Sequence, residues 1–184
     1  MENKDKILLK LARMAILDKI NGENSINKDE FLKENSDLAS MGATFVTLAI
    51  NGELRGCIGS LVAHKELFDD IVSNAVKAAF DDPRFPALSI EEFKNMKIEI
   101  SILGEAKRVK YSDFNDLKTK LVSNEDGVIL KQGLNQATFL PQVWEQLPTF
   151  EEFIVHLYQK AGIDISQQTI FPFIYTYRVR KIEE

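Results

Sequence analysis

The residues best suited to chemistry lie in one short segment, LRGCIG, at residues 54–59. It contains the only cysteine of the chain, Cys57, two residues after Arg55. If the segment is a β-strand, alternate side chains share a face, so Arg55 and Cys57 are neighbours. A guanidinium beside a thiol favours the thiolate, which predicts a pKa for Cys57 below the ordinary value of about 8.5. Cys57 is therefore the candidate catalytic residue.

Two glycines, Gly56 and Gly59, stand on either side of this cysteine. Alternation places Gly59 on the same face as Arg55 and Cys57, where the missing side chain leaves room for a ligand. We therefore predict ligand contact by Arg55, Gly56 and Gly59. A structural explanation stays open, because free cysteine often packs as a small apolar residue. Glycines in strands also often mark bulges or close backbone approach.

A second arginine, Arg84, lies between Pro83 and Pro86 in the segment DDPRFPALS. The prolines force an extended, non-helical connection, which presents Arg84 on a loop. A guanidinium held in this way could bind a carboxylate or a phosphate through two parallel hydrogen bonds. It could equally anchor its own loop by pairing with Asp81 or Asp82. Arg84 is a predicted ligand-binding residue, with both interpretations open.

Glu99 is the last candidate of the site. It is the acid in the middle of the segment KIEISIL, where isoleucines alternate with Glu99 and Ser101. This alternation is typical of a half-buried strand. We predict that Glu99 either helps to hold the ligand or pairs with Arg55.

Signatures of metal and cofactor binding do not occur in the sequence. Two separated histidines and one cysteine do not form a zinc-spaced set, and the cysteine trio of radical-SAM chemistry is missing. Neither the glycine fingerprint of dinucleotide binding nor a P-loop is present. We predict no metal and no cofactor.

The overall charge limits the class of partner. The 184 residues carry a formal net charge of −5, which disfavours nucleic acid and anionic membrane surfaces. No apolar run is long enough to cross a bilayer, and the first residues lack the features of a secretory signal. The expected location is the cytoplasm.

Hydrophobic periodicity and turn signals predict a mixture of helices and strands. Asn51-Gly52 marks a tight turn between two paired strands, and a capping pattern at Thr149 and Glu152 starts a helix that ends near Gly162. Helices are expected over 5–20, 65–80, 111–126 and 149–164; strands over 44–50, 53–60 and 97–106, in a hairpin over 127–144, and in a terminal strand over 169–184. Without regular β-α-β alternation, this order favours an α+β fold with an antiparallel sheet and flanking helices.

Six segments in this order resemble the AMMECR-one domain family, whose prokaryotic members are called AmmeMemoRadiSam system protein A. The resemblance covers Lys6 to Arg180 and rests on GATFVTLAINGELRGCIGSL, DDPRFPALS, IEISIL, GLNQATFLPQVW, EEFIVHLYQKAGI and IYTYRVR. It implies a compact α+β fold with a larger and a smaller lobe. We therefore expect one domain over residues 1–184, with two lobes around one shared core.

The resemblance implies no established activity, but it implies a genomic association with a Memo-like protein and a radical-SAM protein. Together with the LRGCIG segment, this favours an enzyme or modifying subunit that binds a small anionic ligand. Two alternatives stay open. One is a non-catalytic adaptor for these partners, and the other is a nucleic-acid-binding regulator, which the acidic charge disfavours.

Overall fold

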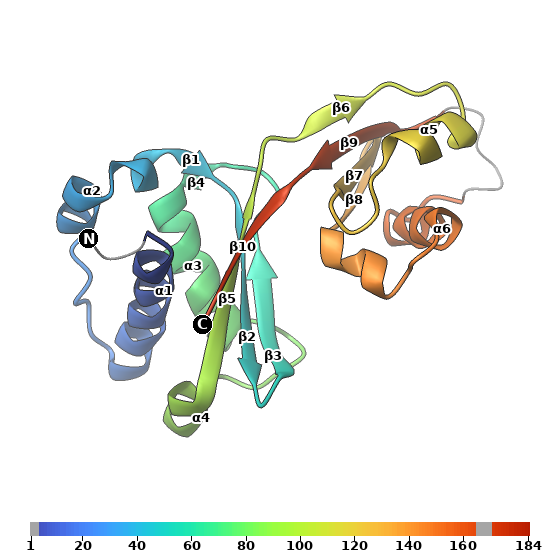
Figure 1. Cartoon of the computed structure of the whole chain (residues 1–184). Helices are drawn as coiled ribbons and strands as arrows, with labels where there is room; N and C mark the ends of the chain where they lie inside the picture. Colours follow the sequence, from blue (N-terminus) through green and yellow to red (C-terminus); the bar gives the residue numbers. More distant parts are fainter. Residues whose placement is uncertain (1–3, 165–170) are drawn as a thin grey trace. The chain divides into compact units, whose positions relative to one another are not determined.

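The predicted α+β fold is confirmed. The computed structural model describes residues 4–164 and 171–184, which form two compact units (Figure 1). Unit 1 comprises residues 1–103 and 180–184, and unit 2 comprises residues 104–179. The chain thus leaves unit 1 at residue 103, builds unit 2, and returns to unit 1 for its last residues.

Unit 1 is an antiparallel sheet with helices on one face. Its four-stranded sheet has the order β10-β5-β2-β3 and contains β2 (Thr44–Ile50), β3 (Glu53–Gly59), β5 (Met96–Leu103) and β10 (Val179–Glu183). Its helices are α1 (Lys4–Asn21), α2 (Lys28–Glu34), a 3-10 turn η1 (Ser36–Ala39), α3 (Leu67–Phe80) and α4 (Ile90–Asn95). A small ladder pairs β1 (Met41–Gly42) with β4 (Lys65–Glu66). The predicted helix over 65–80 therefore starts two residues later, because its first two residues pair with β1.

The β2–β3 hairpin forms as the sequence predicts. Asn51 and Gly52 both have positive φ, at 54° and 84°, which is the geometry of the tight turns that match strand twist. One irregularity follows: the register shifts between Leu48 and Ala49, so that Arg55 has no partner on β2. Such a bulge inserts one extra residue and redirects side chains near it.

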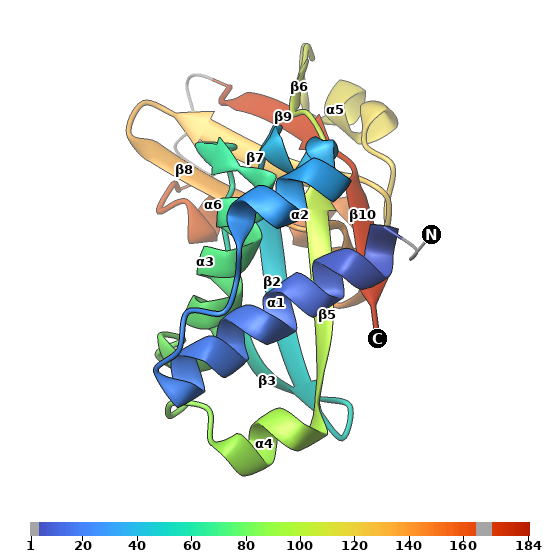
Figure 2. The same ribbon diagram turned by 90° about the vertical axis from the view of Figure 1, so that its left-hand side faces the viewer.

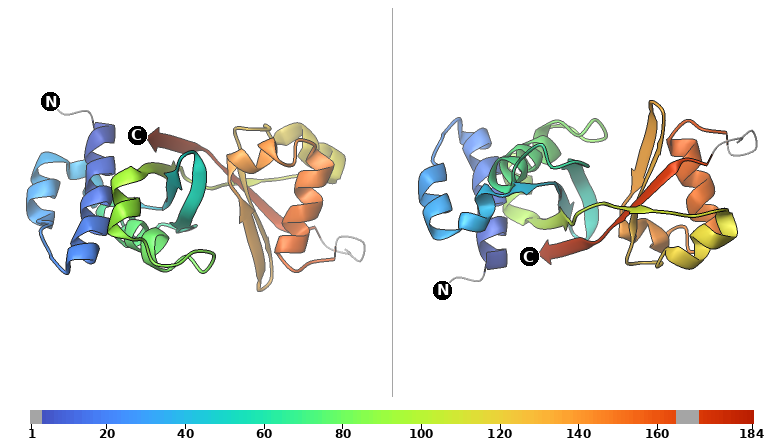
Figure 3. Two further views of the ribbon diagram at one scale, coloured as in Figure 1. Left: turned by 90° about the horizontal axis from the view of Figure 1, so that it is seen from below. Right: turned by 90° about the horizontal axis from the view of Figure 1, so that it is seen from above.

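Helices α1 and α3 cover one face of this sheet (Figure 2; Figure 3). Val46 and Leu48 of β2 and Ile98 and Ile100 of β5 are buried beneath them. Helix α3 approaches β3 so closely that a Cβ atom at Gly56 would lie 2.1 Å from the carbonyl oxygen of Ala78. The opposite face of the sheet carries the alternate residues of each strand.

A buried carboxylate joins α3 to the strands. Asp70, only 2% exposed, accepts hydrogen bonds from the main-chain N–H and hydroxyl of Thr44, both at 2.7 Å, and from Ser60 at 2.6 Å. Asn74, one turn later, donates to Asp70 at 3.0 Å and to the Thr44 carbonyl at 3.0 Å. This network fixes the start of β2 and the end of β3 against α3.

Unit 2 is a second antiparallel sheet, of order β6-β9-β7-β8. Its strands are β6 (Lys107–Val109), β7 (Gly127–Gln132), β8 (Asn135–Phe139) and β9 (Phe173–Tyr177), and its helices are α5 (Phe114–Lys120), a 3-10 turn η2 (Pro141–Glu145) and α6 (Phe150–Lys160). The predicted capping box at Thr149 and Glu152 is present, and Gly162 follows α6 with a φ of 70°. The predicted second hairpin turns at Gly133, whose φ is 60°.

The predicted terminal strand is wrong in one respect. Over the described residues it is two strands, β9 in the sheet of unit 2 and β10 in the sheet of unit 1, interrupted at Arg178. Thr169 and Ile170, where the predicted strand began, lie outside the described residues.

Each unit has its own cluster of buried apolar side chains. One cluster centres on Leu11, Ile71 and Ile100 in unit 1, and the other on Phe153 and Leu157 in unit 2. The described buried residues form these two clusters, and the single domain with one shared core stays a prediction. No helix in the described parts of the chain is long and apolar enough to span a membrane.

The Asp70 network gives a test of the fold. Asp70→Ala leaves the buried Thr44 N–H without its acceptor, so we expect the free energy of unfolding to fall by about 3 kcal/mol. Its neighbour Asp69 is the matched control: its carboxylate is 45% exposed and pairs with Lys28 at 2.7 Å. Asp69→Ala should cost about 1 kcal/mol or less. Urea titrations of both variants make the comparison, and equal losses would show that the buried network contributes no more stability than the exposed ion pair.

Candidate functional site

Three residues of the candidate site form a row across three strands of unit 1. Thr47 of β2 pairs with Cys57 of β3 on one side and with Glu99 of β5 on the other. Residues paired in a ladder point to the same face, so the three side chains are neighbours on the face that α1 and α3 leave uncovered. The Thr47 hydroxyl donates to the Cys57 sulfur at 3.3 Å, and Lys181 of β10 pairs with Glu99 at 2.8 Å.

Asp82 brings the proline-rich loop to the outer edge of β3. Its carboxylate is 4% exposed and accepts the main-chain N–H of Cys57 at 2.9 Å. It also accepts the Arg84 main-chain N–H at 3.1 Å and the side-chain Nε and Nη2 of Arg84 at 2.9 and 2.7 Å. The Arg84 guanidinium holds the pKa of Asp82 well below its usual range, so this carboxylate is charged at neutral pH. Asp82 therefore positions both Cys57 and Arg84.

Arg84 uses one edge of its guanidinium in this pair. Nε and Nη2 face Asp82, while Nη1 has no hydrogen-bond partner among the described residues, and the side chain is 54% exposed. A guanidinium carries five N–H donors in a planar fork, so a second edge remains open to an acceptor. Of the two interpretations of Arg84, the loop-anchoring pair with Asp82 is observed, and it leaves the ligand-binding one open.

Arg55 lies elsewhere than predicted. Because of the bulge, its side chain does not follow the simple alternation with Cys57; it is 7% exposed and pairs with Glu92 of α4 at 2.7 and 3.1 Å. It also donates to the carbonyl of Pro86 at 2.9 Å, while its Nη1 is buried without a partner among the described residues. The predicted pairing of Arg55 with Glu99 is therefore wrong. Arg55 ties the loop to α4, and ligand binding by it stays a prediction that these contacts do not favour.

The pKa of Cys57 moves in the opposite direction to the one predicted. Burial raises the pKa of this half-buried thiol, and the carboxylates of Asp82 and Glu99 raise it further. The hydrogen bond from Thr47 and the charge of Arg84 act against this shift but do not overcome it. The cation that acts on the thiol is thus Arg84 and not Arg55. At neutral pH the group is a thiol and not a thiolate.

The two glycines have packing roles. Gly56 allows the close approach of α3 described above. At Gly59 a Cβ atom would lie 2.3 Å from the Phe45 ring and 2.6 Å from the carbonyl oxygen of Thr44, so the expected space for a ligand is filled by Phe45. Ligand contact by Gly56 and Gly59 remains a prediction.

We call Cys57, Thr47, Glu99, Asp82 and Arg84 the Cys57 cluster. Its thiol, hydroxyl, carboxylates and half-exposed guanidinium can donate and accept hydrogen bonds and move a proton. Within residues 4–164 and 171–184, no three or more His, Cys, Asp or Glu side chains are grouped so as to hold a metal ion.

Comparison with known proteins places the chain in a family. A family model described as AMMECR1 matches residues 9–182. The chain belongs to the AMMECR1 family. The resemblance predicted from the six segments is thereby confirmed.

Relatives and a solved structure agree with this membership. An AMMECR1 relative from Methanothermobacter thermautotrophicus is 32% identical over 163 residues, which cover 86% of this chain and 82% of that protein. One from Sulfurisphaera tokodaii is 36% identical over 175 residues, covering 89% and 74%. The crystal structure of protein PH0010 from Pyrococcus horikoshii matches with a TM-score of 0.83 and 29% identity, over 96% of this chain and 89% of that one.

The Arg55–Glu92 pair predicts a pH dependence of stability. Glu92 accepts hydrogen bonds from Arg55 and from Ser89, and these lower the pKa of Glu92 from 4.5 to about 2. A carboxylate with a lowered pKa stabilises the fold above its unfolded value, and this contribution is lost as the pH falls from about 4.5 towards 2. Glu92→Gln should therefore cost about 1 kcal/mol at pH 7, allowing for the partial exposure of the carboxylate, and almost nothing near pH 2.

Urea unfolding at the two pH values measures this difference. Glu91, the exposed neighbour that pairs with Lys94, supplies the control variant Glu91→Gln. A loss for Glu92→Gln that is the same at both pH values would contradict the role assigned to the ion pair.

Proposed function

We propose that the protein is a small enzyme or a modifying subunit that binds a small anionic ligand at the Cys57 cluster. The observation that carries the proposal is the open edge of the Arg84 guanidinium, fixed next to Cys57 by a shared carboxylate. The two groups that would meet the ligand are the Arg84 fork and the Cys57 thiol.

Preorganisation supports anion binding by Arg84. The Asp82 carboxylate accepts hydrogen bonds from both the main chain and the guanidinium of Arg84, so little side-chain entropy is lost when a ligand binds. A carboxylate or phosphate can accept hydrogen bonds from the remaining N–H groups. The Phe85 ring, 5.5 Å from the Arg84 Cζ, packs against the same guanidinium and limits its movement.

The raised pKa of the thiol suits it to an anionic ligand. A thiolate would repel an anion held by Arg84, whereas a neutral thiol can donate a hydrogen bond to it. Cys57 would then serve as a proton donor: the proton passes from sulfur to the ligand, and the thiolate left behind is stabilised by the Thr47 hydroxyl and the Arg84 charge. The thiolate regains its proton from a solvent water molecule, and the hydroxide that is left is neutralised in the bulk solution. This role differs from the resting thiolate that the sequence predicts.

Alkylation of the single cysteine tests the proposal. With iodoacetamide, the pH dependence of the rate should give a pKa of Cys57 above the ordinary thiol value. Glu99→Gln should lower this pKa and Arg84→Gln should raise it, because the two charges act on the thiol with opposite signs. The Arg84 guanidinium should attract anionic iodoacetate and so raise the rate of its reaction with Cys57. Arg84→Gln should therefore reduce the rate ratio of iodoacetate to iodoacetamide by a factor of about 2–5, the effect of an exposed ion pair.

A charge change on α2 provides the control, since Lys33→Gln alters an exposed residue outside the cluster and should leave both the pKa and the rate ratio unchanged. Circular dichroism checks that every variant is folded. A pKa below the ordinary value would overturn the proton-donor role. A rate ratio that does not respond to Arg84→Gln would overturn anion binding by Arg84.

We further propose, on the family resemblance, that the protein works in the cytoplasm with a Memo-like and a radical-SAM protein. Co-purification of the three proteins from one expression host checks this. Cys57→Ala should leave a complex intact if the thiol acts on the ligand and not in docking. If the three proteins do not associate, the proposal about partners is wrong. The alkylation experiments then still test the role of the Cys57 cluster.

A further inference from the structure

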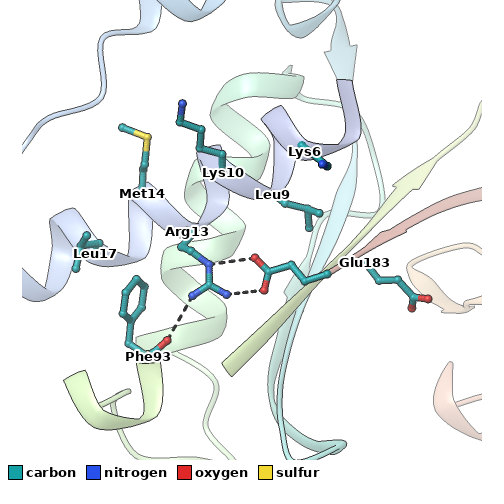
Figure 4. Close-up of a pocket in the computed structure, with 9 residues that line it drawn as sticks. Lys6, Leu9, Lys10, Arg13, Met14, Leu17, Phe93 and Glu183 are labelled. Carbon is teal, nitrogen blue, oxygen red and sulfur yellow. Dashed lines mark hydrogen bonds and ion pairs between the residues drawn. The ribbon is translucent and has the colours of Figure 1, made fainter. Parts of the chain in front are cut away.

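A groove of about 640 Å³ runs along α1 in unit 1, and no residue of the Cys57 cluster lines it. Figure 4 shows the side chains that line it, and we call it the α1 groove. Its apolar lining is Leu9, Met14 and Leu17 of α1 with Phe93 of α4, and its cationic lining includes Lys6 and Lys10. Pockets for small molecules in proteins commonly have volumes of roughly 300–1,000 Å³.

Helix α1 has a second stripe besides the one that packs on the core. Leu8, Leu11, Ala12 and Ile16 are buried in unit 1. The groove residues of α1 recur three and four positions apart and so form one face of the helix, at Lys6, Lys10, Arg13, Met14 and Leu17. Met14 and Leu17 are only partly buried. Apolar side chains of α1 thus remain accessible on this face.

The side chains of this stripe change from cationic to apolar along the helix. Lys6 and Lys10 occupy its N-terminal half, whereas Met14 and Leu17 occupy its C-terminal half, as Figure 4 shows. From residue 6 to residue 17 the helix rises by roughly 16 Å, at about 1.5 Å per residue. The groove therefore has a cationic end and an apolar end, separated by the length of a medium-sized acyl chain.

The charges at the cationic end are uncommitted. Arg13 in the middle of the groove is neutralised by Glu184 and also donates to the carbonyl of Met96 at 3.0 Å. Glu183, at the groove wall, pairs with Lys181 at 3.2 Å. Neither Lys6 nor Lys10 forms an ion pair with another described residue. An anionic group at this end would meet two exposed ammonium groups, of which Lys10 also lines a second pocket with Glu30 and Glu34.

We infer that the α1 groove binds a single-chain amphiphile with an anionic head, such as the carboxylate of a fatty acid. The head lies at Lys6 and Lys10, and the chain lies over Met14 and Leu17 against Phe93. The volume fits a small ligand, and the charge at one end selects an anionic one. The inference uses no residue of the Cys57 cluster and is independent of the proposed function.

Calorimetric titration of the intact protein with decanoate tests the inference. We expect saturable binding at one site. Octanoate, which buries two fewer methylene groups, should bind roughly tenfold more weakly. Decanol, which has the same chain without the charge, should also bind more weakly than decanoate.

Variants locate the site. Leu17→Asp, and independently Met14→Asp, should weaken decanoate binding by about tenfold or more, since each places a carboxylate in the apolar half. The double variant Lys6→Gln/Lys10→Gln should reduce the affinity for decanoate to that for decanol. Lys19→Gln, an exposed change at the end of the same helix, should have no effect. Thermal unfolding of each variant confirms that the fold is retained.

Three results would each overturn the inference. They are the absence of saturable decanoate binding, equal binding of decanol and decanoate, and full binding by both folded apolar-half variants. Binding of an acidic helical peptide in place of decanoate would also overturn it, because the groove would then be a protein-docking surface. The alkylation behaviour of Cys57 would be unaffected in every case.

Discussion

The buried carboxylate of Asp82 is the contact on which the arrangement of the candidate site depends. An unpaired charge at 4% exposure would cost several kcal/mol in lost hydration. Arg84 offsets this cost with two side-chain hydrogen bonds, and the main-chain N–H of Cys57 adds another. That N–H belongs to an edge strand and would otherwise face outward unpaired. One carboxylate therefore pairs with the strand edge and orients a guanidinium next to the thiol.

Two arginines contact or belong to the proline-rich loop, and their roles differ with their exposure. Arg55 is buried, and its pair with Glu92 and its bond to Pro86 fix the loop against α4. Arg84 is half-exposed and keeps one edge of its fork open. Phe85 lies near both, with its ring centre 5.6 Å from the Arg55 Cζ and 5.5 Å from the Arg84 Cζ. The buried arginine holds the loop in place so that the exposed one has a defined position.

The sequence could predict the hairpin but not its register. Asn51-Gly52 determines a two-residue turn, from which simple counting pairs Thr47 with Gly56. The bulge at Arg55 shifts this pairing by one, so that Thr47 faces Cys57. No pattern in the alternating apolar residues marks a bulge, because it depends on how Arg55 is held by Glu92 and Pro86, far along the chain. For the same reason the sequence does not identify Thr47 and Asp82 as site residues. It also predicts Arg55 as the cation beside the thiol, whereas in the structure that cation is Arg84.

The charges of the Cys57 cluster are balanced, and this decides what kind of anion can bind there. Asp82 is matched by Arg84 and Glu99 by Lys181, while the thiol and the Thr47 hydroxyl are neutral. The cluster therefore offers directed N–H donors without a net positive field. A polyanion such as nucleic acid needs an extended basic surface, and on a chain of net charge −5 it gains little from one open guanidinium edge. A small carboxylate or phosphate needs only those directed donors, so the electrostatics that disfavour nucleic acid are compatible with a small anionic ligand.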